Sequence, residues 1–272
     1  MKTDTFSQKV VLITGGSSGI GKAIGDYLTQ HNFKVYGTSR NSTGKSSNFN
    51  LIDLDVTKED SIFKAVNLVL SKEERIDILI NNAGVGITGP IEETPTDEIR
   101  NAFETNFYGP INICKAVLPI MRKQNEGLII NVTSIAGYMG LPYRGIYSAS
   151  KAALEIAAEA LRMEVKGFNI KMTSIAPGDF ATNIASGRYH APVLSDSPYK
   201  KSYGETLKLM NAHVDAGQDP NMMGKAVLNI INEKAPKGHY RVGDLLQKAS
   251  IVLKKILPDK AYEKMLMNHY KL

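Results

Sequence analysis

Short apolar runs alternate with longer segments of helical periodicity along this chain. The runs are rich in β-branched residues and lie near residues 10–13, 34–38, 50–53, 78–81, 128–132, 171–175 and 240–242. Between them, apolar residues recur at the three- and four-residue spacing of amphipathic helices. This alternation predicts a doubly wound α/β (Rossmann) fold, in which a parallel sheet of about seven strands is covered by helices on both faces.

The pattern runs through the 272 residues without a linker or an internal repeat. The longest polar stretch, residues 41–48, is too short to separate domains and is typical of a loop after the second strand. We therefore predict one domain over residues 1–272. It includes a possible substrate lid at about 178–220, where the alternation is interrupted longest, and a basic amphipathic tail at about 244–272.

Polar or conformationally special residues follow the predicted strands. In chain order they are Thr14, Arg40, Asp55, Asn81, Ser134 and Pro177. The carboxyl ends of parallel strands meet at one edge of the sheet, and open α/β sheets bind their ligands there. The sequence therefore predicts a ligand site at this edge.

A glycine-rich loop, Thr14-Gly-Gly-Ser-Ser-Gly-Ile-Gly21, joins the first strand to a helical pattern. Gly15, Gly19 and Gly21 allow the backbone to approach a ligand closely, and the N-terminus of the next helix offers N–H groups to a pyrophosphate. The spacing differs from the common G-x-G-x-x-G fingerprint, so a turn without a ligand is the alternative.

Tyr147 and Lys151 are four residues apart in a helical pattern, which places a phenol and an ammonium on one helix face. A free tyrosine has a pKa of about 10, and an adjacent cation lowers it by favouring the phenolate. The pair therefore indicates acid/base chemistry on an alcohol or a carbonyl, although the same spacing also occurs on solvated helices.

Five motifs occur together in one order: Thr14-Gly15-x-x-x-Gly19-Ile20-Gly21, Asn81-Asn82-Ala83-Gly84, Asn106, Ser134 and Tyr147-x-x-x-Lys151. This set resembles the short-chain dehydrogenase/reductase family from about residue 10 to about residue 242. In its overall sequence pattern the chain is similar to the retinol and 17β-hydroxysteroid dehydrogenase branch. The resemblance implies an oxidoreductase that moves hydride between a nicotinamide and a C=O or CH–OH group.

The resemblance implies a role for each member of the tetrad. Tyr147 exchanges the proton, Ser134 holds the substrate oxygen, and Lys151 favours the phenolate and binds the nicotinamide ribose. Asn106 kinks its helix and anchors a water that resupplies protons. A non-catalytic dinucleotide sensor or scaffold on the same fold is the alternative, although it has no need of this tetrad.

The resemblance also implies a set of cofactor contacts. They are Gly15, Ser17, Ser18, Gly19, Ile20, Gly21, Ser39, Arg40, Asp55, Val56, Asn82, Ala83, Gly84, Tyr147, Lys151, Pro177, Gly178 and Thr182. Ser39 stands where relatives that prefer NAD carry Asp, and Arg40 follows it. Since arginine can neutralise a 2′-phosphate, the expected cofactor is NADP(H).

The substrate is expected to contact apolar and aromatic residues next to Ser134. The candidates are Tyr138, Met139, Leu141, Phe180, Tyr189 and Tyr203. They suggest a cleft for a bulky apolar ketone or alcohol of lipid or steroid type, with a 3-oxoacyl thioester as the alternative substrate. The same aromatics are equally typical of a helical lid that packs on the core.

The formal net charge is +6, and residues 241–272 hold seven Lys/Arg against three Asp/Glu. In this tail apolar residues recur at helical spacing with lysines between them. The apolar residues are Leu245, Leu246, Ala249, Val252, Leu253 and Ile256, and the lysines are Lys248, Lys254 and Lys255. Such a helix docks on its own domain, on a second subunit or on an anionic membrane surface. No nucleic-acid recognition motif accompanies the charge, so nucleic acid is not an expected partner.

The remaining features of the composition bear on the cellular compartment and on metal binding. Cys114 is the only cysteine, no signal-peptide pattern is present at the start, and the apolar runs are too short to span a membrane. We therefore expect a cytoplasmic protein. The five histidines are scattered without ligand spacing, so no metal site is expected. The family resemblance implies a homodimer or homotetramer built through the helices that contain Asn106 and Tyr147.

Overall fold

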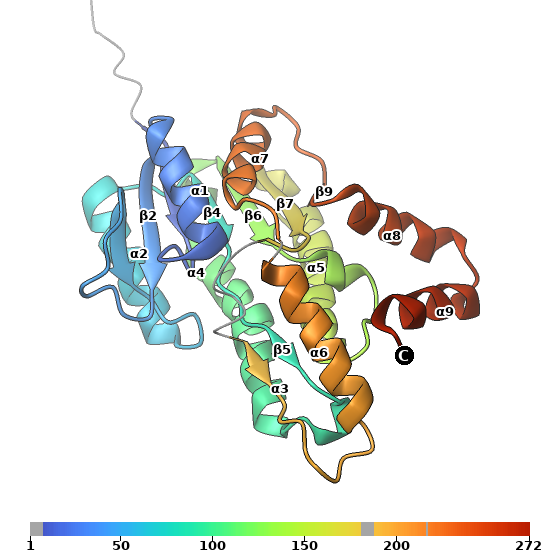
Figure 1. Ribbon diagram of the computed structural model, residues 1–272. Helices are drawn as coiled ribbons and strands as arrows, with labels where there is room; N and C mark the ends of the chain where they lie inside the picture. Colours follow the sequence, from blue (N-terminus) through green and yellow to red (C-terminus); the bar gives the residue numbers. More distant parts are fainter. Residues whose placement is uncertain (1–7, 181–187, 216) are drawn as a thin grey trace, which may run out of the picture.

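A computed structural model describes residues 8–180, 188–215 and 217–272, and its main sheet has seven parallel strands (Figure 1). The strands are β1 (Val10–Ile13), β2 (Lys34–Ser39), β3 (Asn50–Asp53), β4 (Ile78–Asn81), β6 (Gly127–Val132), β7 (Ile170–Pro177) and β9 (His239–Val242). All seven coincide with the predicted runs to within two residues at each end. The Rossmann-type α/β prediction is therefore confirmed.

The spatial order of the strands is β3-β2-β1-β4-β6-β7-β9. The chain builds outward from β1 on one side and then crosses to β4 on the other, so β1 and β4 are the neighbours at which the winding reverses. Thr14, just after β1, donates its backbone N–H to the Ile80 carbonyl of β4 at 3.0 Å. Ligands of open α/β sheets bind beyond such a reversal point.

Helices cover both faces of the sheet (Figure 1). Those on one face are α2 (Glu59–Glu73), α4 (Gly109–Gln124) and α5 (Gly145–Glu164), and those on the other are α1 (Gly19–Gln30) and α7 (Asn221–Asn232). The other helices of the described residues are α3 (Thr96–Phe103), α6 (Lys200–Asp215), α8 (Leu245–Ile256) and α9 (Asp259–Tyr270). Side chains alternate along β1, so Val10 and Leu12 join a core with α2, α4 and α5, whereas Val11 and Ile13 join a core with α1 and α7. Burial on both faces explains why the central strands β1, β4 and β6 are nearly continuous apolar runs.

A second, two-stranded sheet was not predicted. It pairs β5 (Ile87–Thr88) with β8 (Tyr189–His190) in parallel, and the Ala191 N–H extends it to the Thr88 carbonyl at 2.8 Å. Strands of two residues are too short to show a period. This small sheet fastens the described part of the predicted lid to the segment that follows β4.

The C-terminal helices α8 and α9 form a pair at one end of the molecule, beyond β9 (Figure 1). Ile251 of α8 and Tyr262 of α9 are buried in a cluster with Met139, and the Tyr262 hydroxyl lies 2.7 Å from the Met139 sulfur. Of the three expected docking partners, the tail therefore contacts its own domain. Among the residues that the structure describes, no helix is both long enough and apolar enough to cross a membrane.

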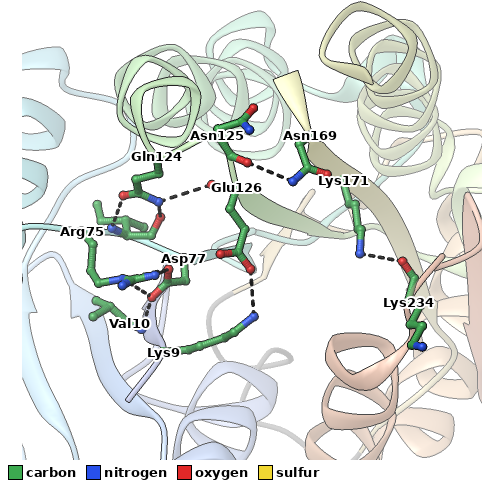
Figure 2. A network of polar contacts seen from close by, with 11 residues as sticks. Lys9, Val10, Arg75, Asp77, Gln124, Asn125, Glu126, Asn169, Lys171 and Lys234 are labelled. Atoms are coloured by element: carbon green, nitrogen blue, oxygen red, sulfur yellow. Dashed lines mark hydrogen bonds and ion pairs between the residues drawn. The ribbon is translucent and has the colours of Figure 1, made fainter. Parts of the chain in front are cut away.

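A polar network lies at the amino ends of the strands (Figure 2), whereas the predicted ligand edge is at their carboxyl ends. The buried Asp77 carboxylate accepts the Val10 N–H at 2.7 Å and the Arg75 Nε–H at 3.0 Å. Close by, Gln124 bonds both the N–H and the carbonyl of Ile76 at 3.0 Å. These contacts join β1, the start of β4 and the end of α4.

Replacing Asp77 with alanine is expected to lower the free energy of unfolding by about 2–4 kcal/mol, because the buried Val10 N–H loses its side-chain acceptor and Arg75 loses its ion pair. Chemical denaturation measures this change. Asp97→Ala is the matched control, since that exposed carboxylate also pairs with an arginine, Arg100 at 3.0 Å. The control should change stability by less than about 0.5 kcal/mol. Equal losses in the two variants would contradict a structural role for the network.

Candidate functional site

A cavity of about 1170 Å³ opens at the carboxyl ends of the strands. It brings together most of the predicted cofactor contacts: Gly15, Ser17, Ser18, Gly19, Ile20, Ser39, Arg40, Asp55, Val56, Asn82, Ala83, Gly84, Tyr147, Lys151 and Pro177. It runs from the glycine loop past the end of β2 and across the sheet to α5. Its size and elongated lining suit a dinucleotide.

The glycine loop has the backbone shape that its sequence predicts. Gly15 and Gly19 adopt φ values of +66° and +52°, which favour glycine. Gly21 does not line the cavity. A Cβ there would lie 2.3 Å from the Gly15 carbonyl oxygen and 2.4 Å from Asn82 Nδ2. Gly21 therefore allows the helix to pack against its own loop.

The N-terminus of α1 fits a phosphate group. Ser18, its N-cap, makes no side-chain capping bond, and the first turn contains no acidic residue. The leading N–H groups of the helix and its positive dipole end thus face the cavity without a competing side chain of their own turn. A pyrophosphate is the kind of ligand that satisfies them.

Thr14 and Asn82 lock the loop onto β4. Thr14 Oγ1 accepts the N–H groups of Asn82 and Ala83, both at 2.9 Å, while Asn82 Nδ2 donates to the carbonyls of Thr14 at 3.0 Å and Gly15 at 3.1 Å. The resemblance implied a ribose contact for the segment 82–84. In the structure Asn82, the first residue of this segment, also stabilises the shape of the glycine loop.

Past the end of β2, the cavity is lined by Ser39, Arg40 and a residue that the sequence analysis missed, Lys45. Lys45 Nζ donates to Ser39 Oγ at 2.6 Å, and Ser39 Oγ donates to the Asn41 carbonyl at 2.9 Å. Lys45 lies in the polar stretch 41–48, where composition alone indicates only a loop. The fold makes it the second cation of this corner.

Tyr147 and Lys151 stand on the first two turns of α5, and both line the large cavity. Lys151 is buried, and its Nζ donates to the Val132 carbonyl at the end of β6 at 3.1 Å. Burial lowers the pKa of Lys151, while the neighbouring Tyr147 and Glu155 act in the opposite direction. The ammonium is therefore held in a site where its charge is costly.

Asn106 lies in a π-helical turn, Glu104–Tyr108, between α3 and α4. Such a turn interrupts the helix, which agrees with the kink that the resemblance implied. The Asn106 amide accepts the Val85 N–H at 2.8 Å and donates to the Val85 carbonyl at 2.9 Å and to Ser150 Oγ at 3.1 Å. Ser150 Oγ in turn donates to the Tyr147 carbonyl at 2.8 Å. Ser150 thus joins Asn106 to the first turn of α5.

A smaller cavity of about 60 Å³ adjoins the first at Tyr147 and Pro177. Its lining includes Ser134, Gly178 and Phe180, three of the predicted site residues. Ser134 Oγ accepts the Ala136 N–H at 3.2 Å, which leaves its own O–H free to donate. Ser134 and Tyr147 therefore face one small space.

The lining of the smaller cavity also contains charged residues that an apolar cleft does not predict: Arg144, Asp179 and Arg188. The Arg144 guanidinium lies 5.3 Å from the centroid of the Tyr147 ring. Burial lowers the pKa of Arg188, and its buried Nη1 has no hydrogen-bond partner among the described residues. The space beside Tyr147 thus carries polar groups on one side.

Several predicted substrate residues lie elsewhere. Of the described aromatic and apolar candidates, Tyr138, Met139, Leu141 and Tyr203 line neither cavity, and Tyr189 lines the large one. Met139 and Leu141 pack with the C-terminal helices, the Tyr138 hydroxyl donates to Glu155 at 2.6 Å, and the Tyr203 hydroxyl donates to the Ala191 carbonyl at 2.9 Å. Of these four residues only Tyr203 belongs to the predicted lid, and its contact with Ala191 fits the lid-packing alternative. Thr182 falls outside the described residues.

Comparison with known proteins agrees with this architecture. The sequence model of the family described as short chain dehydrogenase matches residues 9–192. The chain is 40% identical over 252 residues to a 3-ketodihydrosphingosine reductase of Bacteroides thetaiotaomicron, covering 92% of this chain and 94% of that protein. It is 30% identical over 249 residues to retinol dehydrogenase 8 of Bos taurus, covering 84% and 79%. A crystal structure of a short-chain dehydrogenase from Streptomyces avermitilis gives a TM-score of 0.79 at 30% identity, covering 95% of this chain and 97% of that one.

Proposed function

The chain belongs to the short-chain dehydrogenase family, and from this premise we propose that it is an NADP(H)-dependent oxidoreductase of a long-chain, lipid-like ketone. Family membership makes it an oxidoreductase that acts on CH–OH and C=O groups with a nicotinamide cofactor. The choice of NADP(H), the roles of the individual residues and the substrate are the proposal. The observation that carries it is the convergence of Ser134 and Tyr147 on one cavity beside a dinucleotide-sized one.

The preference for NADP(H) is supported by the corner at the end of β2. Arg40 and Lys45 line the cavity there, and Lys45 is held in place by Ser39. Two cations and a hydroxyl suit a 2′-phosphate, which accepts charge-assisted hydrogen bonds. The carboxylate of Asp53, at the end of β3, accepts the Ser42 N–H at 2.7 Å and does not line the cavity.

A double substitution of Arg40 and Lys45 by alanine is expected to raise the Kd for NADPH about 100-fold and to leave the Kd for NADH within about twofold, because only NADPH carries the 2′-phosphate. Fluorescence titration measures both constants. Lys34→Ala is the matched control, since Lys34 begins the same strand at its opposite end. Equal weakening of NADH and NADPH would sink the proposed 2′-phosphate contact.

The proposed mechanism assigns a proton step to this chain's own side chains. When bound, the nicotinamide supplies hydride to a carbonyl carbon or accepts it from an alcohol. Tyr147 donates its phenolic proton to the carbonyl oxygen, and the free O–H of Ser134 donates to the same oxygen. The ammonium of Lys151 favours the phenolate that results. The Asn106–Ser150 link holds the backbone of Tyr147 in place.

The proposed substrate class draws on the 40%-identical relative, which is named for reduction of 3-ketodihydrosphingosine. That molecule joins a ketone and a polar amino-alcohol head to a long alkyl chain. Asp179, beside the proposed Ser134 and Tyr147 pair, offers a carboxylate to such a head. A 3-oxoacyl thioester shares the ketone and the alkyl chain and stays the alternative substrate.

The first experiment follows the loss of NADPH absorbance with 3-ketodihydrosphingosine, a 3-oxoacyl thioester and retinal as separate substrates. Turnover of the first at the highest kcat/KM is the expected result. A higher kcat/KM for the thioester would show that the 3-oxoacyl thioester, and not 3-ketodihydrosphingosine, represents the substrate class. NADPH binding without turnover of any carbonyl, or of the corresponding alcohols with NADP⁺, would instead favour the non-catalytic sensor.

We also propose that the protein forms a homo-oligomer through α4 and α5. Ile156 and Met163 on α5 are 66% and 70% exposed, and they stand seven residues apart on one helix face. Tyr108, just before α4, is also exposed. Large apolar side chains on one surface are typical of a subunit contact. Sedimentation velocity of the wild type and of Ile156→Glu tests this contact, and an unchanged monomer in both would reject it.

A further inference from the structure

Helix α8 turns an apolar stripe away from the protein. The stripe consists of Leu245, Ala249, Val252 and Ile256, at spacings of four, three and four residues, with Leu246 beside it. All five residues are exposed, and the exposed fractions of the four larger side chains are 83% for Leu245, 84% for Leu246, 49% for Val252 and 67% for Ile256. A surface helix ordinarily places such a stripe against its own domain. Here the stripe has no cover among the described residues.

The orientation of α8 is fixed by the opposite side of the helix. Ile251 is buried with Met139 and Tyr262, and Asp244 and Gln247 form a capping box at the first turn. Gln247 Nε2 also donates to the Asp179 carboxylate at 2.9 Å. Turning the helix over to bury the stripe would break all of these contacts.

Lysines border the outer stripe. At 100° per residue, Lys248 and Lys255 fall beside Val252 along one flank of the stripe. In α9, Lys260 and Lys264 are exposed as well. Two copies of this surface would bring like charges together, whereas an anionic lipid surface offers opposite charge to the lysines and hydrocarbon to the stripe.

We propose that the outer stripe of α8 rests in the interface of an anionic lipid bilayer, with the flanking lysines on the lipid headgroups. The position of α8 would place such a bilayer near the small cavity. Asp179, which holds Gln247 of α8, lines the small cavity with Ser134 and Tyr147. A bilayer under α8 would therefore lie close to the entrance for a lipid substrate. Only this last step rests on the proposed function.

Cosedimentation of the full-length protein with vesicles tests the contact. Vesicles of phosphatidylcholine alone are compared with vesicles that contain about one third phosphatidylglycerol. Binding to the anionic vesicles is expected to be at least about tenfold tighter and to be lost in high salt. Leu245→Ser/Leu246→Ser/Ile256→Ser should reduce it at least about tenfold, and Lys248→Gln/Lys255→Gln by about fivefold for each lysine.

The matched control is Phe63→Ser/Leu68→Ser, which removes exposed apolar side chains from α2 and should leave vesicle binding unchanged. Thermal melts and NADPH titration verify that every variant is folded. Equal vesicle binding by the wild type and the stripe variant would overturn the proposal. So would a change of oligomeric state in the stripe variant without lipid, because the stripe would then be a subunit contact. This experiment measures lipid binding and not turnover. A failure of the lipid-surface proposal is therefore distinguishable from a failure of the proposed ketone reduction.

Discussion

Replacing Tyr147 with phenylalanine is expected to lower kcat by about 10²–10⁴-fold, the range that a positioned general acid contributes. The ring remains to fill its place between the two cavities, and only the proton-donating hydroxyl is removed. The Kd for NADPH should change by less than about threefold, because no cofactor phosphate depends on this hydroxyl. Stopped-flow measurement of NADPH oxidation and fluorescence titration give the two quantities.

Tyr143→Phe is the matched control. It removes a hydroxyl only four residues away, one that donates to Ser202 Oγ at 2.8 Å and lines neither cavity. Its kcat should stay within about threefold of the wild type. If Tyr147→Phe kept comparable activity, the proton would have to come from another group, and the proposed mechanism would be wrong.

Lys151→Met is expected to act in opposite directions on activity and on stability. Turnover should fall at least about 100-fold, because the cation that favours the phenolate is gone. The free energy of unfolding of the ligand-free protein should rise by about 1–2 kcal/mol, since methionine fills the buried site without a charge. For a chain of this size, the melting temperature should increase by about 2–8 °C.

The stability gain should depend on pH in a defined direction. Burial lowers the pKa of Lys151 in the folded protein below the ordinary value of 10.5, so at neutral pH the unfolded chain holds this proton more readily. The cost to the wild type is therefore largest at pH values below the lowered pKa and shrinks as pH rises from there toward 10.5. The gain in Lys151→Met should shrink with it. Lys115→Met, at an exposed lysine, should show neither the gain nor the pH trend.

The fold followed from the sequence because its signals are long and redundant. The central strands β1, β4 and β6 are buried, mostly apolar runs, and the order of elements leaves few topologies open. Much of the lining of the large cavity followed as well, since it comes from the strand ends and the glycine loop. Gly21 shows the limit of that inference, because its motif position indicated a ligand contact, whereas in the structure it packs against Gly15 and Asn82.

The substrate side could not be predicted from the sequence, because it depends on tertiary packing. Met139 and Leu141 lie next to Ser134 in sequence, yet the C-terminal helices cover them. Arg188 reaches the small cavity only because β8 pairs with β5, a contact between segments about a hundred residues apart. Lys45 likewise lines the large cavity only because the loop that contains it folds back beside Ser39, and this loop has no periodicity in its sequence. Side chains placed by such long-range contacts carry no local signature.

The polar network at the amino ends of the strands has a consequence for how this protein can change. Asp77 and its partners hold β1 and β4 together at the edge farthest from the cavities. Residues around the cavities can then vary without loosening those strand starts. A mutational library confined to the lining of the small cavity should thus yield many folded members with altered substrate choice. The same number of substitutions around Asp77 should yield mostly insoluble protein. The stability of the strand starts around Asp77 is therefore what allows the cavity residues of this enzyme to evolve.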